Sequence, residues 1–590
     1  MISLTTRKRI LCLRLAAFGH CRTALIPLVL SAAALAQAPT PTATPPAVFD
    51  NLRAPVFIVP RSADLELEDN TTRRKLVAPA TGQGPKFTVT GFKLTGLSVP
   101  VKADLGVLLA RYVGPERSFD DLEAAAEALQ TAIRQEGLFL AQVDIPPQKL
   151  DGGTVELRVL EGRLEKWELA PLPDGLTVGR EQIEAILSHL KPGDLLNVDA
   201  IERVLFLLSD LRGIVVKSVI EPGSAPGTAR LVVTTEPGRR FEKSADFDNF
   251  GSIYTGEYRF SGSFAVNSPF GSGDFFKLSG NLSTNGGLFF VRGAYQTPVG
   301  GSGLKLGAAV SALSYKLGTV SFATAQASGN AAVYSVYALY PLVRNRNFNT
   351  FAQANYDRRN FEDKFFPLVK NKHSDVLSLG LVGDSRDQAL GGGINNFSLG
   401  LTFGHLALSA EQLAADRGGA GRKVNGAFGK LSYGAGRQNL LWGNPDNIQD
   451  RLVLYASWQG QRASRNLDNS EKFSLGGASG VRGYASGEGS GDSGDLLSWE
   501  LRKSVFGEKL QGDLVISLFG DYGRVTVNRN PLVADLVRTI SLASHGVGLT
   551  WAVPDNFLFK LSLARRGSYV PVADPDPRRM RLYVSLSKTL

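Results

Sequence analysis

The sequence predicts a membrane β-barrel of about 16 antiparallel strands, preceded by two small α/β domains. Three observations support this fold class. A basic and then apolar segment with the features of an export signal opens the 590-residue chain. A pattern of helices and strands occurs twice between residues 86 and 237, and residues 241–590 alternate apolar and polar side chains. No later segment approaches the roughly 18 consecutive apolar residues of a transmembrane helix, so strands are the predicted spanning elements.

Residues 1–36 form the predicted signal. The basic triplet RKR lies at 7–9, and the apolar run ALIPLVLSAAALA follows at 24–36. This run is shorter than the roughly 20 residues that cross a bilayer, and its small residues are typical of a cleavage site. Cys12 and Cys21, the two cysteines of the sequence, both lie in this segment. We therefore expect an exported mature protein without disulfides or cysteine metal sites.

Residues 37–85 form a predicted linker. Six prolines lie between residues 37 and 60, a density typical of an extended segment. The segment RSADLELEDNTTRRKL at 61–76 leaves a helix that plugs the barrel as an open alternative, although its apolar stripe is thin.

Residues 86–162 form the first predicted α/β domain. An alternating strand begins at residue 86, and a helix begins at Ser118, three residues before Asp121, and ends at Gly137. Two further strands follow the helix. One helical face carries the apolar residues Leu122, Ala126, Leu129 and Ile133.

Residues 163–237 repeat this pattern and form the second predicted domain. A strand leads into two amphipathic helices, and two strands end the unit. The apolar faces of these helices contain Ile183, Ile186, Leu187 and Leu190 in the first, and Ile201, Leu205, Leu208 and Leu211 in the second.

Residues 241–590 form the predicted barrel. Tyr258, Phe260, Phe264 and Val266 alternate with polar or small residues, and the same period of two recurs along the region. A soluble sandwich would also alternate, but about 350 residues of strands without a linker exceed one sandwich domain. A strand with its turn repeats about every 22 residues, which gives an even number of strands near 16. We expect no helix in this region.

Composition argues against several classes of function. The formal net charge of +10 is mild for this length and no basic cluster contains interleaved aromatics, so we expect no nucleic-acid partner. The chain has neither a G-x-S-x-G elbow nor a Walker A motif, and its five histidines lack the spacing of metal ligands. We therefore expect no enzyme activity, catalytic residue, metal or cofactor.

Three segments carry a resemblance to a known family. They are VDIPPQKLDGGTVELRVLEGRL at 143–164, FDNFGSIYTGEYRF at 247–260 and YPLVRNRNFNTFAQANYD at 340–357. Together with the order of domains, they resemble the two-partner secretion transporters (TpsB), the FhaC/ShlB/HecB-like family of hemolysin secretion/activation proteins. The resemblance covers residues 86–590 and implies two periplasmic POTRA domains before the barrel. The chain departs from the family in ending with Leu590, where an aromatic residue is usual.

The long loop predicted at 462–494 contains the motif Val481, Arg482, Gly483 and Tyr484. Its roughly 33 residues far exceed the 2 to 5 of an ordinary hairpin, although a solvated Gly/Ser-rich turn is the alternative. This family belongs to a superfamily of outer-membrane barrels preceded by POTRA domains, whose sixth extracellular loop carries a VRGY motif. In the superfamily this loop folds into the barrel lumen. Its arginine there contacts an acidic wall residue of an F/G-x-D motif. Phe519 and Asp521 match that motif, and strand parity turns both, and Glu500, inward.

The resemblance implies an outer-membrane pore of a Gram-negative bacterium that secretes a partner exoprotein from the periplasm to the cell surface. The POTRA domains would bind the partner's N-terminal secretion domain by adding a strand to a sheet edge. The VRGY loop would act as a latch. Further expected partners are outer-membrane lipid and the barrel assembly machinery that inserts the protein. A BamA-like insertase and a diffusion porin are the alternatives; two POTRA domains favour secretion over insertion.

Overall fold

The computed structural model describes residues 67–69, 85–150, 152–318, 326–419, 421–443, 451–505, 511–532, 535, 537–572 and 578–590. The predicted signal at 1–36 lies outside the described residues, as does nearly all of the linker at 37–85. Of the possible plug helix at 61–76, the structure describes strand β1 (Leu67–Asp69), which pairs in parallel with the second α/β domain. A continuous helix over 61–76 is therefore wrong, and the rest of this segment lies outside the described residues.

The first α/β domain packs two helices against two small sheets. Its elements are β2 (Phe87–Val89), β3 (Gly91–Thr95), α2 (Leu105–Ala110), β4 (Gly114–Arg117), α3 (Phe119–Gln135), β5 (Gln142–Asp144) and β6 (Thr154–Leu160). Helix α3 begins with the capping box that the sequence predicts. Ser118 Oγ accepts a hydrogen bond from the Asp121 amide, and the Asp121 carboxylate accepts one from the Ser118 amide. All four residues of its predicted apolar face are buried. The sequence did not predict α2, which is short and buries only Leu109.

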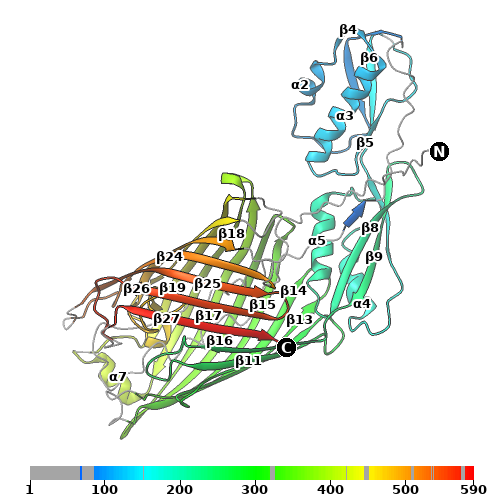
Figure 1. Cartoon of the computed structure of the whole chain (residues 1–590). Coiled ribbons are helices and arrows are strands. Elements are labelled where there is room, and N and C mark those ends of the chain that lie inside the picture. The colour runs from blue at the N-terminus through cyan, green and yellow to red at the C-terminus, as the bar shows by residue number, and fades with distance from the viewer. Residues whose placement is uncertain are drawn as a thin grey trace.

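The second α/β domain consists of β7 (Arg163–Leu169), α4 (Arg180–Leu187), α5 (Val198–Ser209), β8 (Ile214–Pro222) and β9 (Thr228–Pro237). Its sheet has the order β1-β8-β9-β7. The predicted apolar faces of both helices lie in its core. In Figure 1 this domain lies between the first domain and the barrel.

The junction between the two α/β domains is held by Glu161. Its carboxylate accepts hydrogen bonds from the amide and hydroxyl of Ser98, the latter at 2.7 Å, and from Arg163 Nη2 at 2.9 Å. Burial acts to raise the pKa of Glu161, but these hydrogen bonds outweigh it and lower the pKa below its ordinary value. The carboxylate is therefore ionised at neutral pH.

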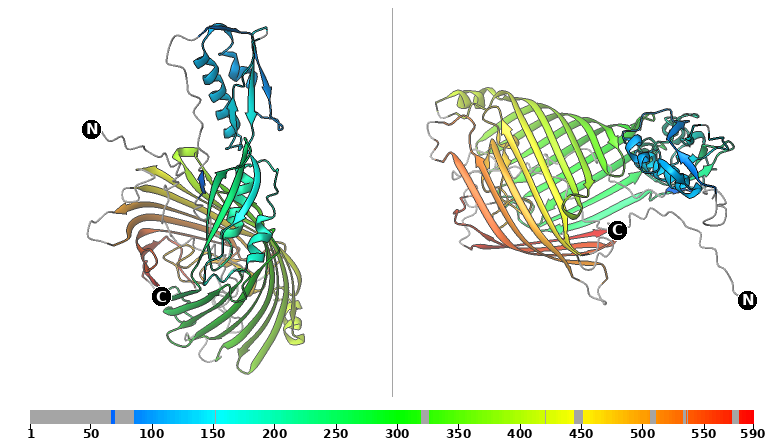
Figure 2. Two further views of the ribbon diagram at one scale, coloured as in Figure 1. Left: turned by 90° about the vertical axis from the view of Figure 1, so that its right-hand side faces the viewer. Right: turned by 90° about the horizontal axis from the view of Figure 1, so that it is seen from above.

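The remaining chain forms a closed antiparallel barrel, which confirms the predicted fold class. Strand β10 closes it by pairing with β27, from Ser244↔Thr589 to Asp248↔Ser585. Figure 2 shows the strands tilted around the lumen. The 16 strands are β10 (Phe241–Asp248), β11 (Arg259–Asn267), β12 (Phe275–Ser283), β13 (Leu288–Val299), β14 (Leu304–Lys316), β15 (Ser328–Arg344), β16 (Phe348–Phe365), β17 (Leu368–Asp387), β18 (Gly393–Leu408), β19 (Gly426–Trp442), β20 (Leu452–Ala463), β23 (Ser493–Val505), β24 (Asp513–Thr526), β25 (Thr539–Val553), β26 (Phe557–Arg566) and β27 (Met580–Thr589).

The barrel strands differ in length and present two distinct faces. Strand β10 has 8 residues and β11 and β12 have 9 each, whereas β17 has 20.

The two faces of a barrel strand differ in exposure. On β24, Ile516, Leu518 and Tyr522 are exposed, and Phe519 and Asp521 between them are buried. The exposed apolar face points outward and the buried face points into the lumen. Among the helices that the structure describes, none is long and apolar enough to cross a membrane.

The barrel region contains a helix that the sequence analysis did not expect. Helix α7 (Ala410–Arg417) lies in the loop between β18 and β19. Ser409 begins it with a capping box that includes Gln412, so the signal was present in the sequence as S-x-x-Q. Its residues form no apolar face, because only Asp416 is buried, and an amphipathic pattern was therefore missing.

Helix α5 docks the second α/β domain onto the barrel. The Asp210 carboxylate accepts hydrogen bonds from Arg344 Nη2 at 2.7 Å and Nε at 3.1 Å. The Arg344 side chain is fully buried and lies over the Phe206 ring of α5, 4.6 Å from its centroid. Figure 1 shows α5 beside the barrel end at which the α/β domains lie, here called the near end. The second α/β domain is thus fixed to the barrel by a buried ion pair.

Candidate functional site: the lumenal loop

The chain between β20 and β23, residues 464–492, folds into the barrel and is here called the lumenal loop. It contains a 3-10 turn at Asn469–Glu471 and the short strands β21 (Phe473–Ser474) and β22 (Ser490–Gly491), which pair with each other. Between Asn466 and Asp492 the only exposed residue is Ser479. A segment rich in glycine and serine is therefore packed, and the solvated-turn alternative is wrong for the described conformation.

Arg482 contacts two carboxylates of the barrel wall. Its Nε and Nη2 donate to the two carboxylate oxygens of Asp521 on β24, each at 2.9 Å. Its Nη1 donates to Glu500 Oε1 on β23 at 2.7 Å, and its backbone amide also donates to Asp521. The planar fork of arginine can make this paired contact, whereas the single ammonium of lysine cannot.

The surroundings of Arg482 remove it from water. Its guanidinium lies over the Phe519 ring, 3.4 Å from the centroid, and the Asp521 side chain is fully buried. Ser544 donates a further hydrogen bond to Asp521, and Arg502 binds the second oxygen of Glu500 at 2.8 Å. Two arginines thus face two carboxylates, so the group is electrically balanced.

The other motif residues hold the backbone of the loop. Val481 and Tyr484 lie in an apolar cluster with Leu475, Val525 and Leu542, among others. The Tyr583 hydroxyl on β27 donates to the Tyr484 carbonyl at 2.6 Å and accepts from the Gly483 amide at 3.3 Å. Gly483 has a φ of +93°, and an added Cβ would lie 3.0 Å from the Arg566 nitrogen. Glycine is therefore required at this position.

The structure brings together all seven residues that the sequence singled out. Val481, Arg482, Gly483 and Tyr484 lie against the wall, and Phe519, Asp521 and Glu500 point inward as strand parity indicates. Sequence reasoning missed Ser544, Arg502 and Tyr583. All three side chains point inward, and alternation along the strand predicts this. Alternation predicts the same for half of the residues of every strand, however, and no local motif marks these three.

The charged side chains around Arg482 are engaged in ion pairs with one another. Over the part of the chain that the structure describes, no group of three or more His, Cys, Asp or Glu side chains could hold a metal ion.

Comparison with protein families places most of the chain. Residues 227–551 match the model of the haemolysin secretion/activation proteins ShlB/FhaC/HecB. Residues 87–162 match the model of the POTRA domain, ShlB-type. The first match covers more than half of the chain.

Relatives and solved structures agree with these matches. The heme/hemopexin transporter protein HuxB of Haemophilus influenzae strain 86-028NP is 26% identical over 471 residues, which are 79% of this chain and 80% of HuxB. The outer membrane transporter CdiB of Dickeya dadantii is 24% identical, over 83% of this chain and 84% of CdiB. The structure of CdiB from Escherichia coli superposes with a TM-score of 0.68 at 21% identity, covering 87% of this chain and 93% of that one. CdiB from Acinetobacter baumannii gives a TM-score of 0.60 at 18% identity, covering 86% and 91%.

Proposed function

The chain belongs to the family of haemolysin secretion/activation proteins ShlB/FhaC/HecB, and we propose that it secretes one partner exoprotein through its barrel. It is an outer-membrane protein, so the near end of the barrel, with its α/β domains, faces the periplasm. The relatives HuxB and CdiB are both transporters, and HuxB is a heme/hemopexin transporter. The observation that carries the proposal is the lumenal loop, which lies against the inner wall of a closed barrel and is joined to it by polar contacts that can exchange.

The VRGY segment would act as a latch on the pore. Breaking a buried ion pair by removing one partner costs roughly 3 to 5 kcal/mol, and water in the lumen lowers that value. A contact of this strength holds the loop at rest and still permits release when a partner protein binds. Glycines at 476, 477, 480, 483, 487 and 489 lower the cost of rearranging the loop backbone.

The α/β domains would bind the partner on the periplasmic side. In the first domain, β5 (Gln142–Asp144) is an edge strand of the sheet β3-β6-β5. An extended segment of the partner could add to such an edge through main-chain hydrogen bonds. The unfolded partner would then pass through the lumen, and its folding at the cell surface would prevent return. No nucleotide site is needed for this cycle.

Deletion of the gene in its native host tests the proposed function. Quantitative proteomics of the culture supernatant and the outer membrane should show loss of one large secreted protein with a normal outer membrane. A broad fall in outer-membrane barrels would instead identify an insertase, and an unchanged supernatant would contradict secretion.

Arg482→Ala tests the latch. The variant should secrete much less partner while its barrel still inserts, because the carboxylates of Asp521 and Glu500 lose their shared cation. Arg482→Lys should restore only part of the activity, since one ammonium cannot bind both carboxylates in the same way. Arg462→Ala is the matched control, because Arg462 pairs with Asp495 with about half of its side chain exposed (48%). Full secretion by Arg482→Ala would exclude the latch.

A further inference from the structure

The lumenal loop has a second set of charged contacts with the barrel wall, at its base rather than at its tip. The base is defined as residues 466–472, and the tip as residues 473–491. We propose that Asp468 and Glu471 are positioning residues that fix the base to β16, β17 and β19, so that the base is a static hinge and only the tip moves. This inference rests on the proposed secretion function and concerns how its latch opens.

Glu471 lies between two cations of the wall. Its Oε1 accepts from Arg359 Nη1 on β16 at 2.5 Å, and its Oε2 accepts from Lys430 Nζ on β19 at 2.7 Å. The Glu471 side chain is only 2% exposed. Arg359 is in turn held by Asp357, whose other oxygen accepts from Ser335. A carboxylate this deeply buried requires both cations, and its contacts are little weakened by salt.

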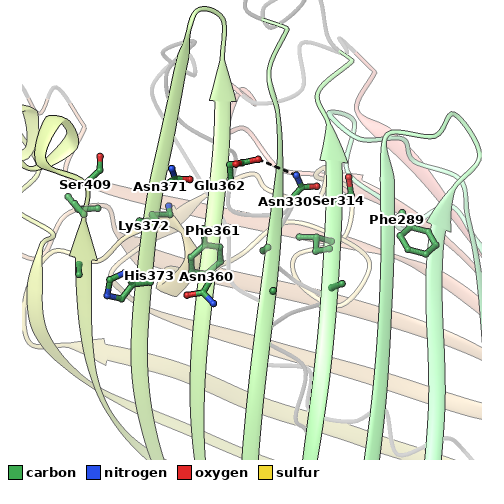
Figure 3. Close-up of a pocket in the computed structure, with 16 residues that line it drawn as sticks. Phe289, Ser314, Asn330, Asn360, Phe361, Glu362, Asn371, Lys372, His373 and Ser409 are labelled. Atoms are coloured by element: carbon green, nitrogen blue, oxygen red, sulfur yellow. Dashed lines mark hydrogen bonds between the residues drawn. The ribbon is translucent and has the colours of Figure 1, made fainter.

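Asp468 makes a separate contact with β17, the strand next to β16 in the barrel. Both of its carboxylate oxygens accept from Lys372 Nζ on β17, at 2.9 and 3.0 Å. Lys372 also lies 3.6 Å from Asp363 of β16 and 5.4 Å from the centroid of the Phe361 ring. Figure 3 shows Lys372 and Phe361 on these neighbouring strands. Asp468 also caps the 3-10 turn that contains Glu471, so the two anchors form one rigid unit.

A third ion pair closes the base against the end of the loop. Lys472 Nζ lies 3.0 Å from Asp492 Oδ1, and the two side chains are 4% and 0% exposed. Asp492 also accepts from the amides of Leu467 and Arg529. The two stems of the lumenal loop are therefore joined to each other before the tip begins.

The base and the tip are held by different parts of the wall. The base contacts β16, β17 and β19, whereas Arg482 in the tip contacts β23 and β24. Strands β17, β18, β19, β20 and β23 lie between β16 and β24 in the barrel order. The loop thus reaches from one part of the wall to another, with several buried pairs at the base and one arginine at the tip. All charged contacts of the tip with the strands of the wall pass through one side chain, Arg482, whereas Asp468 and Glu471 hold the base separately. The tip is therefore the end that releases first.

Cross-linking tests which end of the loop moves. Both cysteines of the sequence lie in the predicted signal, so introduced cysteines would be the only thiols of the exported protein. One double variant, Asn466→Cys with Asn530→Cys, is joined by a short cleavable thiol reagent at the base, where the Asn530 amide donates to Asn466 Oδ1 at 2.7 Å and neither residue belongs to the proposed anchors. A second, Ser486→Cys with Phe250→Cys, joins the tip to the first loop of the barrel, where Ser486 donates to the Phe250 carbonyl at 3.0 Å. We expect secretion to continue with the base joined, and to stop with the tip joined until the reagent is cleaved. Loss of secretion on joining the base would overturn the proposal.

Single-channel conductance in planar bilayers tests the anchors without any partner protein. Asp468→Asn with Glu471→Gln should raise the frequency of open events at least about tenfold, since a buried pair that loses its charge shifts an equilibrium by that factor or more. Asp495→Asn is the control, because Asp495 pairs outside the loop base with Arg462. An unchanged open frequency in a variant that migrates as a folded barrel would also overturn the proposal. If no variant and no wild-type protein secretes a partner, the proposed function fails, and conductance alone decides the anchor.

Discussion

Asp210, the C-cap of helix α5, and Arg344 of strand β15 form a bidentate ion pair in which the arginine side chain is fully buried. The pair joins a periplasmic domain to the barrel, and two neighbouring contacts support it. Arg203 donates to the Pro341 carbonyl at 3.0 Å, and Lys305 donates to the Asp210 carbonyl at 3.2 Å. Several interactions of different kinds thus meet at one joint.

Asp210→Ala should lower the stability of the joint strongly. Arg344 would lose its carboxylate in a buried position, which costs about 3 kcal/mol or more. Thermal unfolding of the detergent-solubilised protein should show a lower midpoint, with the second α/β domain gaining hydrogen exchange first. Lys217→Ala is the control, since Lys217 and its partner Glu236 are each about half exposed (44% and 50%) and such pairs contribute little. Equal midpoints for both variants would contradict a structural role for the pair.

Gly483→Ala should release the tip of the lumenal loop although Arg482 is unchanged. Alanine is strained by roughly 1 to 2 kcal/mol at a left-handed φ, and here its Cβ would also press on the backbone of Arg566. Open events in planar bilayers should become more frequent. Gly286→Ala is the control outside the lumenal loop, because Gly286, in the turn between β12 and β13, has a φ of +70° and no atom near the added Cβ. If both variants show the same open frequency, the conformation at Gly483 does not hold the tip.

The first α/β domain should lose stability in acid through Glu161. Its pKa in the folded protein is lowered, so its contribution is fully present above the unfolded value of about 4.3 and is lost as the pH falls through the folded pKa. The protection factors for hydrogen exchange in residues 85–150 and 152–160, corrected for the slower intrinsic exchange in acid, should therefore fall below about pH 4. Glu161→Gln should make exchange faster at neutral pH and flatten this dependence. A variant that keeps the wild-type pH profile would show that other carboxylates dominate.

Ser118→Ala should destabilise the first α/β domain by about 1 kcal/mol, because the N-terminal amides of α3 lose their side-chain acceptor. The measurement is urea unfolding of the full chain, followed through hydrogen exchange of α3. Thr131→Ala removes a hydroxyl within the same helix that donates only to the Glu127 carbonyl, and it should change stability little. A cap of no consequence would leave the two variants indistinguishable.

Local patterns account for the parts of this molecule that could be predicted from the sequence. The alternation on β24 indicated that Phe519 and Asp521 point inward, and the S-x-x-D signature gave the first residue of α3. The anchors of Glu471 could not be predicted, because Arg359 is more than a hundred residues away and inward parity describes half of every strand. The burial of the lumenal loop was equally hidden, since its glycines and serines are typical of solvated turns until a barrel encloses them.

The unequal strands of the barrel have a consequence for the surrounding lipid. A barrel strand needs about 9 to 11 residues to cross the hydrocarbon layer. Strand β10, with 8 residues, is shorter than this, and β11 and β12, with 9 each, have the minimum length. Strand β17, with 20 residues, is much longer. A short strand is accommodated by a thinner bilayer or by a tilt of the barrel. We therefore expect the bilayer to be thinnest beside β10, β11 and β12.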